Sequence, residues 1–239
     1  MTQLTLSNLG VVFGGYRRDT PDRGHAVTVD ALPMFPLGAV LLPGELLPLQ
    51  VFEPRYLEMI AHLTSSPDLM RFGVVLISRG HEVGGGDQRT DVGTVARIID
   101  CEQAPGGRLL LGCVGERRIR VRRWLPDDPY PRADVEPWPD GGAMHGAEAI
   151  DEVGALVDEL GGLLSRSAAQ HGIPAPEFPR LDELPGEMGD RVFALAASLP
   201  LVAADRLRLL SAPGPGERLT VLAEALGDVI AAVRFRLSE

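Results

Sequence analysis

The chain has 239 residues, of which 45% are hydrophobic and 23% are charged, so it is able to bury a substantial core and is not a disordered protein. Its formal net charge of −10 produces a field that repels nucleic-acid phosphates and anionic membranes. The 23 residues counted as lysine or arginine are all arginines, which excludes Schiff bases, Ser–Lys dyads and the phosphate-binding lysine of a P-loop.

The first 30 residues predict a poorly ordered extension, with one short strand possible at residues 11–13. This start has no basic stretch followed by a long apolar run, so we expect no secretory signal. The most apolar stretch, residues 32–52, is interrupted by prolines and glycines and cannot form a membrane helix. We therefore expect a cytoplasmic protein without a membrane partner.

Residues 31–140 predict a β domain, because short runs of Val, Ile and Leu alternate with Gly, Pro and Asp clusters. Gly106 and Gly107 predict a hairpin, and Gly115 predicts another. A helix that begins at Pro54 interrupts the strands, since apolar residues follow it at helical spacing. The predicted strands span residues 40–42, 47–52, 72–78, 93–100, 108–114, 117–124 and 130–136.

After a linker at residues 139–142, residues 145–236 predict a helical bundle. Residues 150–164 and 192–199 have apolar residues three and four apart, residues 203–210 predict a short helix, and a long final helix follows. The fold class predicted from this order is α+β: a curled sheet or small barrel with one interrupting helix, then helices. Residues 141–239 carry a net charge of −7, against −3 for residues 1–140, so an anion-binding surface is expected in the first part.

No motif in the sequence predicts an enzyme. The five histidines do not pair with one another or with cysteine at metal-ligand spacing, and we expect no metal and no cofactor. Cys101 and Cys113 lie in neighbouring predicted strands and are interpreted as reduced thiols, although they are placed so that they could face each other.

The strongest charge pattern is in the predicted strand at residues 117–124. Alternate residues of a strand share a face, so Arg118, Arg120 and Arg122 are expected to point to solvent and Ile119 and Val121 to the core. Three guanidiniums about 7 Å apart favour contact with an anion or RNA. The alternative is a solvated face on which the arginines pair with acidic residues of the next strand.

Residues 35–56 resemble the start of the substrate-binding (N-terminal) domain of the ATP-dependent protease Lon. That family opens with a Phe-Pro-Leu strand, a Leu-x-Pro-Gly turn, a Pro-Leu strand and a Phe-Glu-Pro-Arg-Tyr helix entry, here residues 35–37, 41–44, 48–49 and 52–56. The resemblance covers about residues 32–230 and continues through residues 72–76, 92–98, 108–112, 118–121, 199–210 and 217–219. It implies a PUA-like pseudo-barrel followed by a helical bundle.

The resemblance implies a non-catalytic protein that binds protein or unfolded peptide segments, in proteolysis or protein quality control, without the ATPase and Ser–Lys protease modules of Lon. A groove in the dense apolar segment would be lined by Phe35, Leu42, Leu46 and Phe52, each of which is also a candidate for the core. Glu53 and Arg55 are interpreted as a structural ion pair at the helix entry. The alternative function is a PUA-like RNA-binding module that uses Arg118, Arg120 and Arg122, the arginine stripe.

Overall fold

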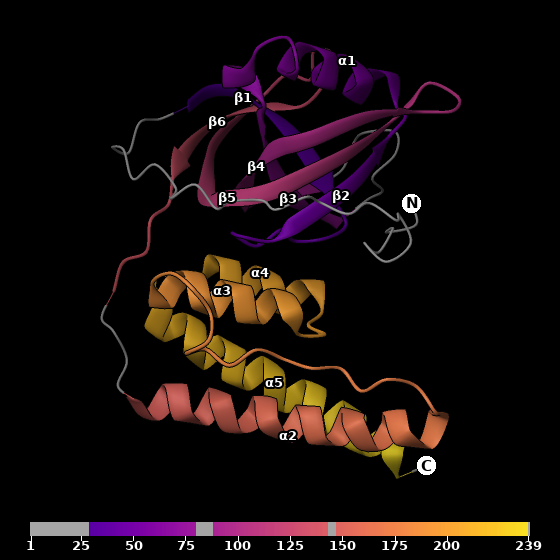
Figure 1. Cartoon of the computed structure of the whole chain (residues 1–239). Coiled ribbons are helices and arrows are strands. Elements are labelled where there is room, and N and C mark those ends of the chain that lie inside the picture. The colour runs from indigo at the N-terminus through magenta and orange to yellow at the C-terminus, as the bar shows by residue number, and fades with distance from the viewer. Residues whose placement is uncertain (1–28, 80–87, 143–146, 239) are drawn as a thin grey trace. The chain divides into compact units, whose positions relative to one another are not determined.

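The computed structural model describes residues 29–79, 88–142 and 147–238. The chain divides into two compact units, one ending at Trp138 and the other beginning at Pro139, and each is described by itself (Figure 1). Strands fill the first unit and helices fill the second, so the predicted α+β class and its order are confirmed. The predicted extension lies outside the described residues as far as position 28, and with it the predicted strand at residues 11–13, whereas residues 29 and 30 belong to a strand.

The described part of the first unit forms a six-stranded mixed sheet in the order β2-β5-β4-β3-β1-β6, in which β1 and β3 are parallel. The elements are β1 (Val29–Leu37), β2 (Leu46–Val51), α1 (Pro54–Leu63), the 3-10 turn η2 (Pro67–Leu69), β3 (Arg71–Arg79), β4 (Gln88–Ala104), β5 (Arg108–Leu125) and β6 (Arg132–Pro137).

Strand β5 organises the unit because it pairs with three neighbours. One edge follows β4 along its length, while the other edge pairs first with β2 and then with β6. The β5–β6 pairing closes β5, β4, β3, β1 and β6 into a ring and leaves β2 outside it as an edge strand. The predicted break at Gly115 was wrong: Gly115 lies inside β5 at a shift in the β4 register, and the chain does not turn there.

Two apolar clusters occupy opposite faces of the sheet, as strand alternation requires. One draws only on the five ring strands and fills the barrel: Leu32, Met34, Val75, Val95, Ile119, Ala133 and Val135. The other lies against β2 and α1, where Tyr56, Met59, Ile60 and Leu63 are all buried, at the spacing that the sequence predicted. Full burial of side chains of this size contributes about 1.5–3 kcal/mol each, which fixes α1 on the sheet.

A carboxylate supports an irregular point where β1 joins β6. Ala31 has a φ of 55°, a conformation that alanine rarely adopts, and the β1–β6 register shifts between Val29 and Leu32. The Ala31 N–H donates a 3.0 Å hydrogen bond to Asp134 Oδ1, and Arg123 forms an ion pair with Asp134 at 2.6 Å. These two donors lower the pKa of Asp134, the Ala31 N–H having the larger effect.

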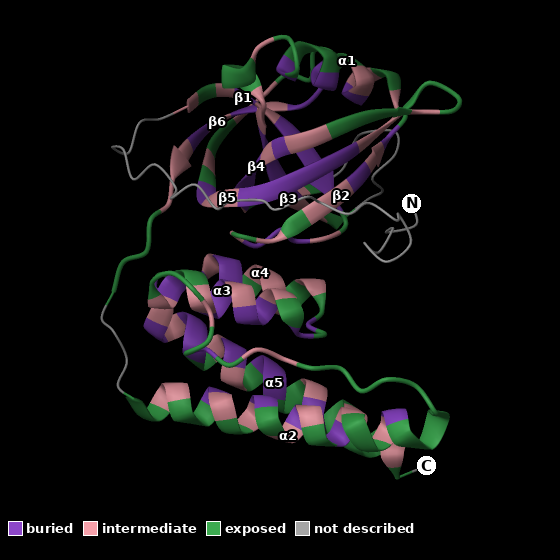
Figure 2. Ribbon diagram, in the orientation of Figure 1, coloured by how far each residue is buried: buried purple, intermediate pink, exposed green. Residues whose placement is uncertain are grey.

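The second unit contains α2 (Ala147–His171), α3 (Met188–Ser198), α4 (Ala203–Ser211) and α5 (Pro215–Leu237), and α5 packs against the other three. Buried and exposed positions alternate along α2 and α5, as expected for amphipathic helices (Figure 2). The predicted apolar positions Val153, Val157 and Leu160 of α2 are buried. The proline-rich segment between α2 and α3 contains turns and no helix.

The segment predicted as a linker is held tightly to the helices of this unit. Asp140 forms an ion pair with Arg218 of α5 at 2.6 Å, and Arg218 is fully buried. Its guanidinium also donates to the Gly189 carbonyl at 3.1 Å and lies 3.6 Å from the centre of the Phe193 ring. A Cβ on Gly189 would meet Asp140 Oδ2 at 2.1 Å, so the acid and the N-terminus of α3 approach each other as closely as glycine permits.

The pKa shift of Asp134 predicts a dependence of stability on pH. A carboxyl whose folded pKa is lowered stabilises the fold at higher pH, and that contribution disappears as the pH falls through the folded pKa. The ordinary value is 3.8, so we expect the loss to begin near that pH and to continue below it. Asp134→Asn should be less stable at pH 7 and should show a shallower loss of stability below pH 3.8.

Both tryptophans, Trp124 and Trp138, lie in the first unit, so tryptophan fluorescence in urea at each pH follows its unfolding. The control Asp68→Asn removes an exposed acid of η2 and should keep the wild-type slope. Equal slopes for Asp134→Asn and the wild type would contradict the assignment.

The buried ion pair predicts a large effect of Asp140→Asn on the second unit. Removal of one partner leaves a buried charge without compensation, which costs about 3–5 kcal/mol. We expect a corresponding loss in the free energy of unfolding, measured by circular dichroism at 222 nm in urea, because the helices dominate that signal. Asp228→Asn, an exposed acid of α5, is the matched control, and an equal small loss in both variants would refute the role of the pair.

Candidate functional site

The four residues predicted to line a groove separate into two pairs. Phe35 and Leu42 are buried, with 4% and 0% of their surface exposed. The Phe35 ring stacks on Tyr56 with 4.1 Å between ring centres, so Phe35 is a core residue. Leu46 and Phe52 are exposed, at 37% and 43%. The structure therefore brings Leu46 and Phe52 to the surface and assigns the other two to the core.

Leu46 is the first residue of edge strand β2, and Phe52 directly follows its last residue, Val51. Alternation along the strand places Leu46, Pro48, Gln50 and Phe52 on one side, opposite the buried Leu49 and Val51. We call these four side chains the edge face. At the rise of an extended strand it is about 20 Å long. It is mainly apolar, and β2 ends the sheet order, so no described strand pairs with its second edge.

A docked turn fixes the start of β2. The turn residue Gly44 has a φ of 80° and its N–H donates to the Gly115 carbonyl at 2.8 Å, while the Gly115 N–H donates to the Glu45 carbonyl at 2.9 Å. A Cβ on Gly115 would lie 2.4 Å from the Leu42 carbonyl oxygen. Glycine at position 115 thus allows the turn to rest directly on β5 and sets the register of β2.

The entry to α1 fixes the other end of β2. The predicted ion pair is present, with Arg55 Nε 3.1 Å from Glu53 Oε2, and the Arg55 guanidinium also lies 4.5 Å from the centre of the Tyr56 ring. Pro54 occupies the first helical turn, where a missing N–H has no cost. Phe52 immediately precedes this rigid entry, so its position at the end of the edge face is well defined.

The predicted exposure of the arginine stripe was partly wrong. Arg118 is 4% exposed, because its guanidinium is covered by the Trp138 ring, whose centre is 4.5 Å away. Arg120 is exposed, but its guanidinium packs on the same ring at 3.6 Å, and Arg122 forms an ion pair with Glu136 at 3.5 Å. No pattern in the sequence indicates that Trp138 returns to this strand. Of the three arginines, Arg120 and Arg122 are the exposed ones.

The described residues contain no group of three His, Cys, Asp or Glu side chains placed to hold a metal ion. Both cysteines are free: Cys113 is buried and Cys101 is exposed. Burial raises the pKa of both thiols, with a further increase at Cys101 from the charge of Asp100, so both are protonated at neutral pH. Among the described residues no helix is long and apolar enough to cross a bilayer.

Comparison with known proteins gives one consistent relationship. The family model for the ATP-dependent protease La (LON) substrate-binding domain matches residues 31–228. A Lon protease of Roseiflexus castenholzii is 27% identical over 201 residues, which are 80% of this chain and 23% of that protein. The chain therefore spans less than a quarter of the length of this curated relative.

Two solved structures are similar to most of the chain. A Lon N-terminal domain protein from Xanthomonas campestris is 31% identical, with a TM-score of 0.57 over 81% of this chain and 97% of that one. The N-terminal domain of the Mycobacterium avium complex Lon protease has a TM-score of 0.56 over 83% and 98%, and at 20% identity it supports the fold alone.

The docked turn predicts that Gly115→Ala destabilises the first unit. A Cβ 2.4 Å from a backbone oxygen forces the turn off β5, and overpacking of this kind costs about 1–3 kcal/mol. The loss should appear as a lower urea midpoint in tryptophan fluorescence. Glu102→Ala is the control: Glu102 is an exposed residue of β4 in the same unit, so the midpoint should change little. An unchanged midpoint for Gly115→Ala would show that the turn does not depend on this approach.

Proposed function

This chain belongs to the LON substrate-binding domain family, and we propose that it is a non-catalytic module that binds protein segments, unfolded peptide segments in particular. The relatives matched are a Lon protease and Lon N-terminal domains, which supports a role in proteolysis or protein quality control. The matched region corresponds to the substrate-binding part of the family.

The observation that carries the proposal is the edge face. Among the described residues of the first unit, three large hydrophobic side chains are exposed, and two of them belong to this face: Leu46, the first residue of β2, and Phe52, which directly follows the strand. Continuous exposed apolar surface is typical of a binding site, and the partly exposed Pro48 lies between Leu46 and Phe52 on the same side of the strand. The edge of β2 with which no described strand pairs adds backbone N–H and C=O groups, which an extended peptide can pair with as an additional strand.

An extended segment on this edge would gain affinity from two sources. Backbone hydrogen bonds would hold it independently of sequence, and alternate apolar side chains would cover Leu46 and Phe52. Burial contributes about 25 cal/mol per Å² of apolar surface, and much of this gain offsets the ordering of the peptide. Such binding recognises unfolded chains, because folded proteins rarely present an extended apolar segment with free backbone groups.

The sequence supports the absence of catalysis in this module. It contains no lysine, so it cannot supply the Ser–Lys dyad of a protease or the lysine of a P-loop. The RNA-binding alternative is less well supported, because Arg118 is buried and Arg122 is paired with Glu136.

The edge face predicts the effect of replacing its two apolar ends. Leu46→Ser with Phe52→Ser should weaken binding of a fluorescein-labelled, permanently unfolded polypeptide such as reduced carboxymethylated lactalbumin by about 10–30-fold, measured by anisotropy, since two interface side chains that contribute about 1 kcal/mol each lose about 2 kcal/mol together. Leu69→Ser is the matched control: Leu69 is 42% exposed and lies in η2, outside β2, so it should leave the affinity unchanged.

An equal effect of both changes would show that the edge face is not the site. Absence of binding to the wild type at tens of micromolar would refute the proposed function. Labelled single-stranded RNA forms the second arm, in which affinity that falls steeply with salt would favour the alternative instead.

A further inference from the structure

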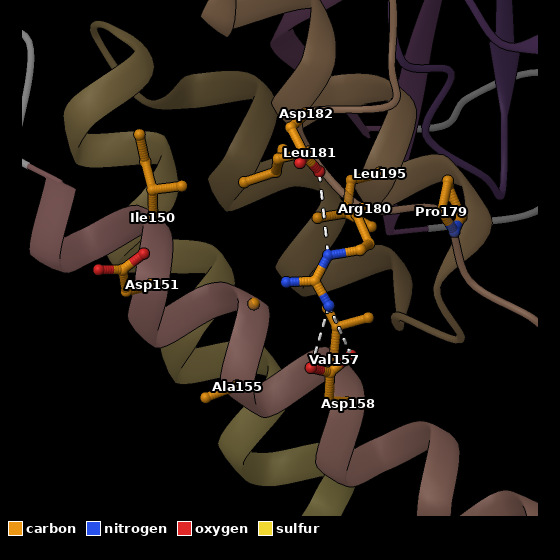
Figure 3. A pocket seen from close by; sticks show the side chains of 11 residues that line it. Ile150, Asp151, Ala155, Val157, Asp158, Pro179, Arg180, Leu181, Asp182 and Leu195 are labelled. Atoms are coloured by element: carbon orange, nitrogen blue, oxygen red, sulfur yellow. Dashed lines mark hydrogen bonds and ion pairs between the residues drawn. The ribbon is translucent and has the colours of Figure 1, made fainter.

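A groove lies in the second unit, between the first half of α2 and the segment that leads from the proline-rich loop to α3 (Figure 3). Its volume is about 390 Å³, within the range of sites that accept a ligand or a few side chains. It is lined by Ile150, Asp151, Gly154, Ala155, Val157, Asp158, Pro179, Arg180, Leu181, Asp182 and Leu195. We call it the α2 groove.

The groove combines an apolar surface with small residues at its centre. Ile150 and Val157 contribute from α2, Leu181 from the loop and Leu195 from α3. At Gly154 a Cβ would meet only the Arg180 guanidinium, at 4.0 Å. The helix surface is therefore low at this point, and the space beside it admits an incoming aliphatic side chain.

Acidic groups outnumber basic groups at the groove. Asp151, Asp158 and Asp182 supply three carboxylates, and Arg180 supplies one guanidinium. Arg180 lies between two of them, with Nη1 3.2 Å from Asp158 and Nε 3.9 Å from Asp182 (Figure 3). Asp151 has no ion-pair partner among the described residues. The groove thus already holds one guanidinium and retains a net negative charge.

The arginine in the groove is weakly held. The side chains of Arg180, Asp158 and Asp182 are 56%, 63% and 82% exposed. Ion pairs at such exposed positions contribute at most about as much as a twofold to fivefold change in an equilibrium. An external guanidinium can therefore share or replace these contacts at little cost.

We propose that the α2 groove binds a client segment in which an arginine is flanked by aliphatic residues. The guanidinium would contact Asp151 and Asp158, and the aliphatic neighbours would cover Ile150 and Leu181. Arginine suits the site better than lysine, since its planar fork binds a carboxylate through two parallel N–H donors. This inference rests on the proposed function and adds to it a second contact with a stated residue preference.

The experiment compares two fluorescein-labelled decapeptides that differ at one position. The first has a single arginine between leucines, and the second has citrulline there, which keeps the shape and removes the charge. By anisotropy with the full chain, we expect the arginine peptide to bind about tenfold more tightly. Asp151→Asn with Asp158→Asn should abolish this preference, and Arg180→Ala should strengthen binding of the arginine peptide severalfold.

Two controls separate this inference from the proposed function. Glu152→Gln removes an exposed acid of α2 that does not line the groove, and it should keep the preference. Leu46→Ser with Phe52→Ser should leave the arginine preference unchanged, because the edge face belongs to the other unit. If the wild type shows no preference, or if the double Asp variant retains it, the groove proposal is overturned while the edge face stands. If neither peptide binds, both proposals fail.

Discussion

The close approach of the Leu42 carbonyl to Gly115 is the constraint on which the candidate binding surface depends. Strand β5 must pair with two different strands along one edge, and the point between them is where the turn at Gly44 docks. Any side chain at position 115 would occupy the place of the turn. This contact starts β2 in register, and the register places Leu46 and Phe52 outside while Leu49 and Val51 enter the core.

In the second unit an ion pair fixes the path of a connecting segment. Asp140 reaches the N-terminus of α3 and the side chain of Arg218, which also stacks on Phe193. A fully buried guanidinium is tolerable only because a carboxylate, a carbonyl and an aromatic face surround it. The result is that a segment rich in glycine and proline has a fixed path. In both units a stretch that resembles a flexible connection is held by one close contact.

The sequence predicted those parts of the fold in which apolar residues recur at a regular spacing. Residues of α1, α2 and α3 at three- and four-residue spacing are buried, and the hairpin at Gly106 and Gly107 joins β4 to β5. The predicted strand at residues 40–42 is wrong, because the chain is irregular there before the turn at Gly44, and β1 (Val29–Leu37) was not predicted as a strand from its residue pattern. The errors at Gly115 and Arg118 share another cause. Each depends on a partner distant in the chain, Leu42 in one case and Trp138 in the other, and alternation along one strand carries no information about what covers it.

The same reasoning explains how much of the candidate site was predictable. The high density of apolar residues identified the segment that contains Leu46 and Phe52. It did not show that these two are exposed while Phe35 and Leu42 are buried, because that difference depends on the packing of the folded chain. The α2 groove was not predicted at all. Arg180 lies 22 residues from Asp158 across a proline-rich loop whose path has no periodic signal. Three aspartates in a strongly acidic half of the chain were the one sign available.

Pro48 at the middle of β2 bears on which partners an open edge will accept. A proline in an edge strand is tolerated where its nitrogen faces away from the neighbouring strand, so the outer rim of β2 lacks one donor at its centre. Two copies of this chain joined rim to rim would both bring that gap, whereas a foreign segment without proline meets it only once. Pro48 therefore disfavours pairing between the β2 edges of two copies of this chain. It disfavours pairing with a strand from a different protein less.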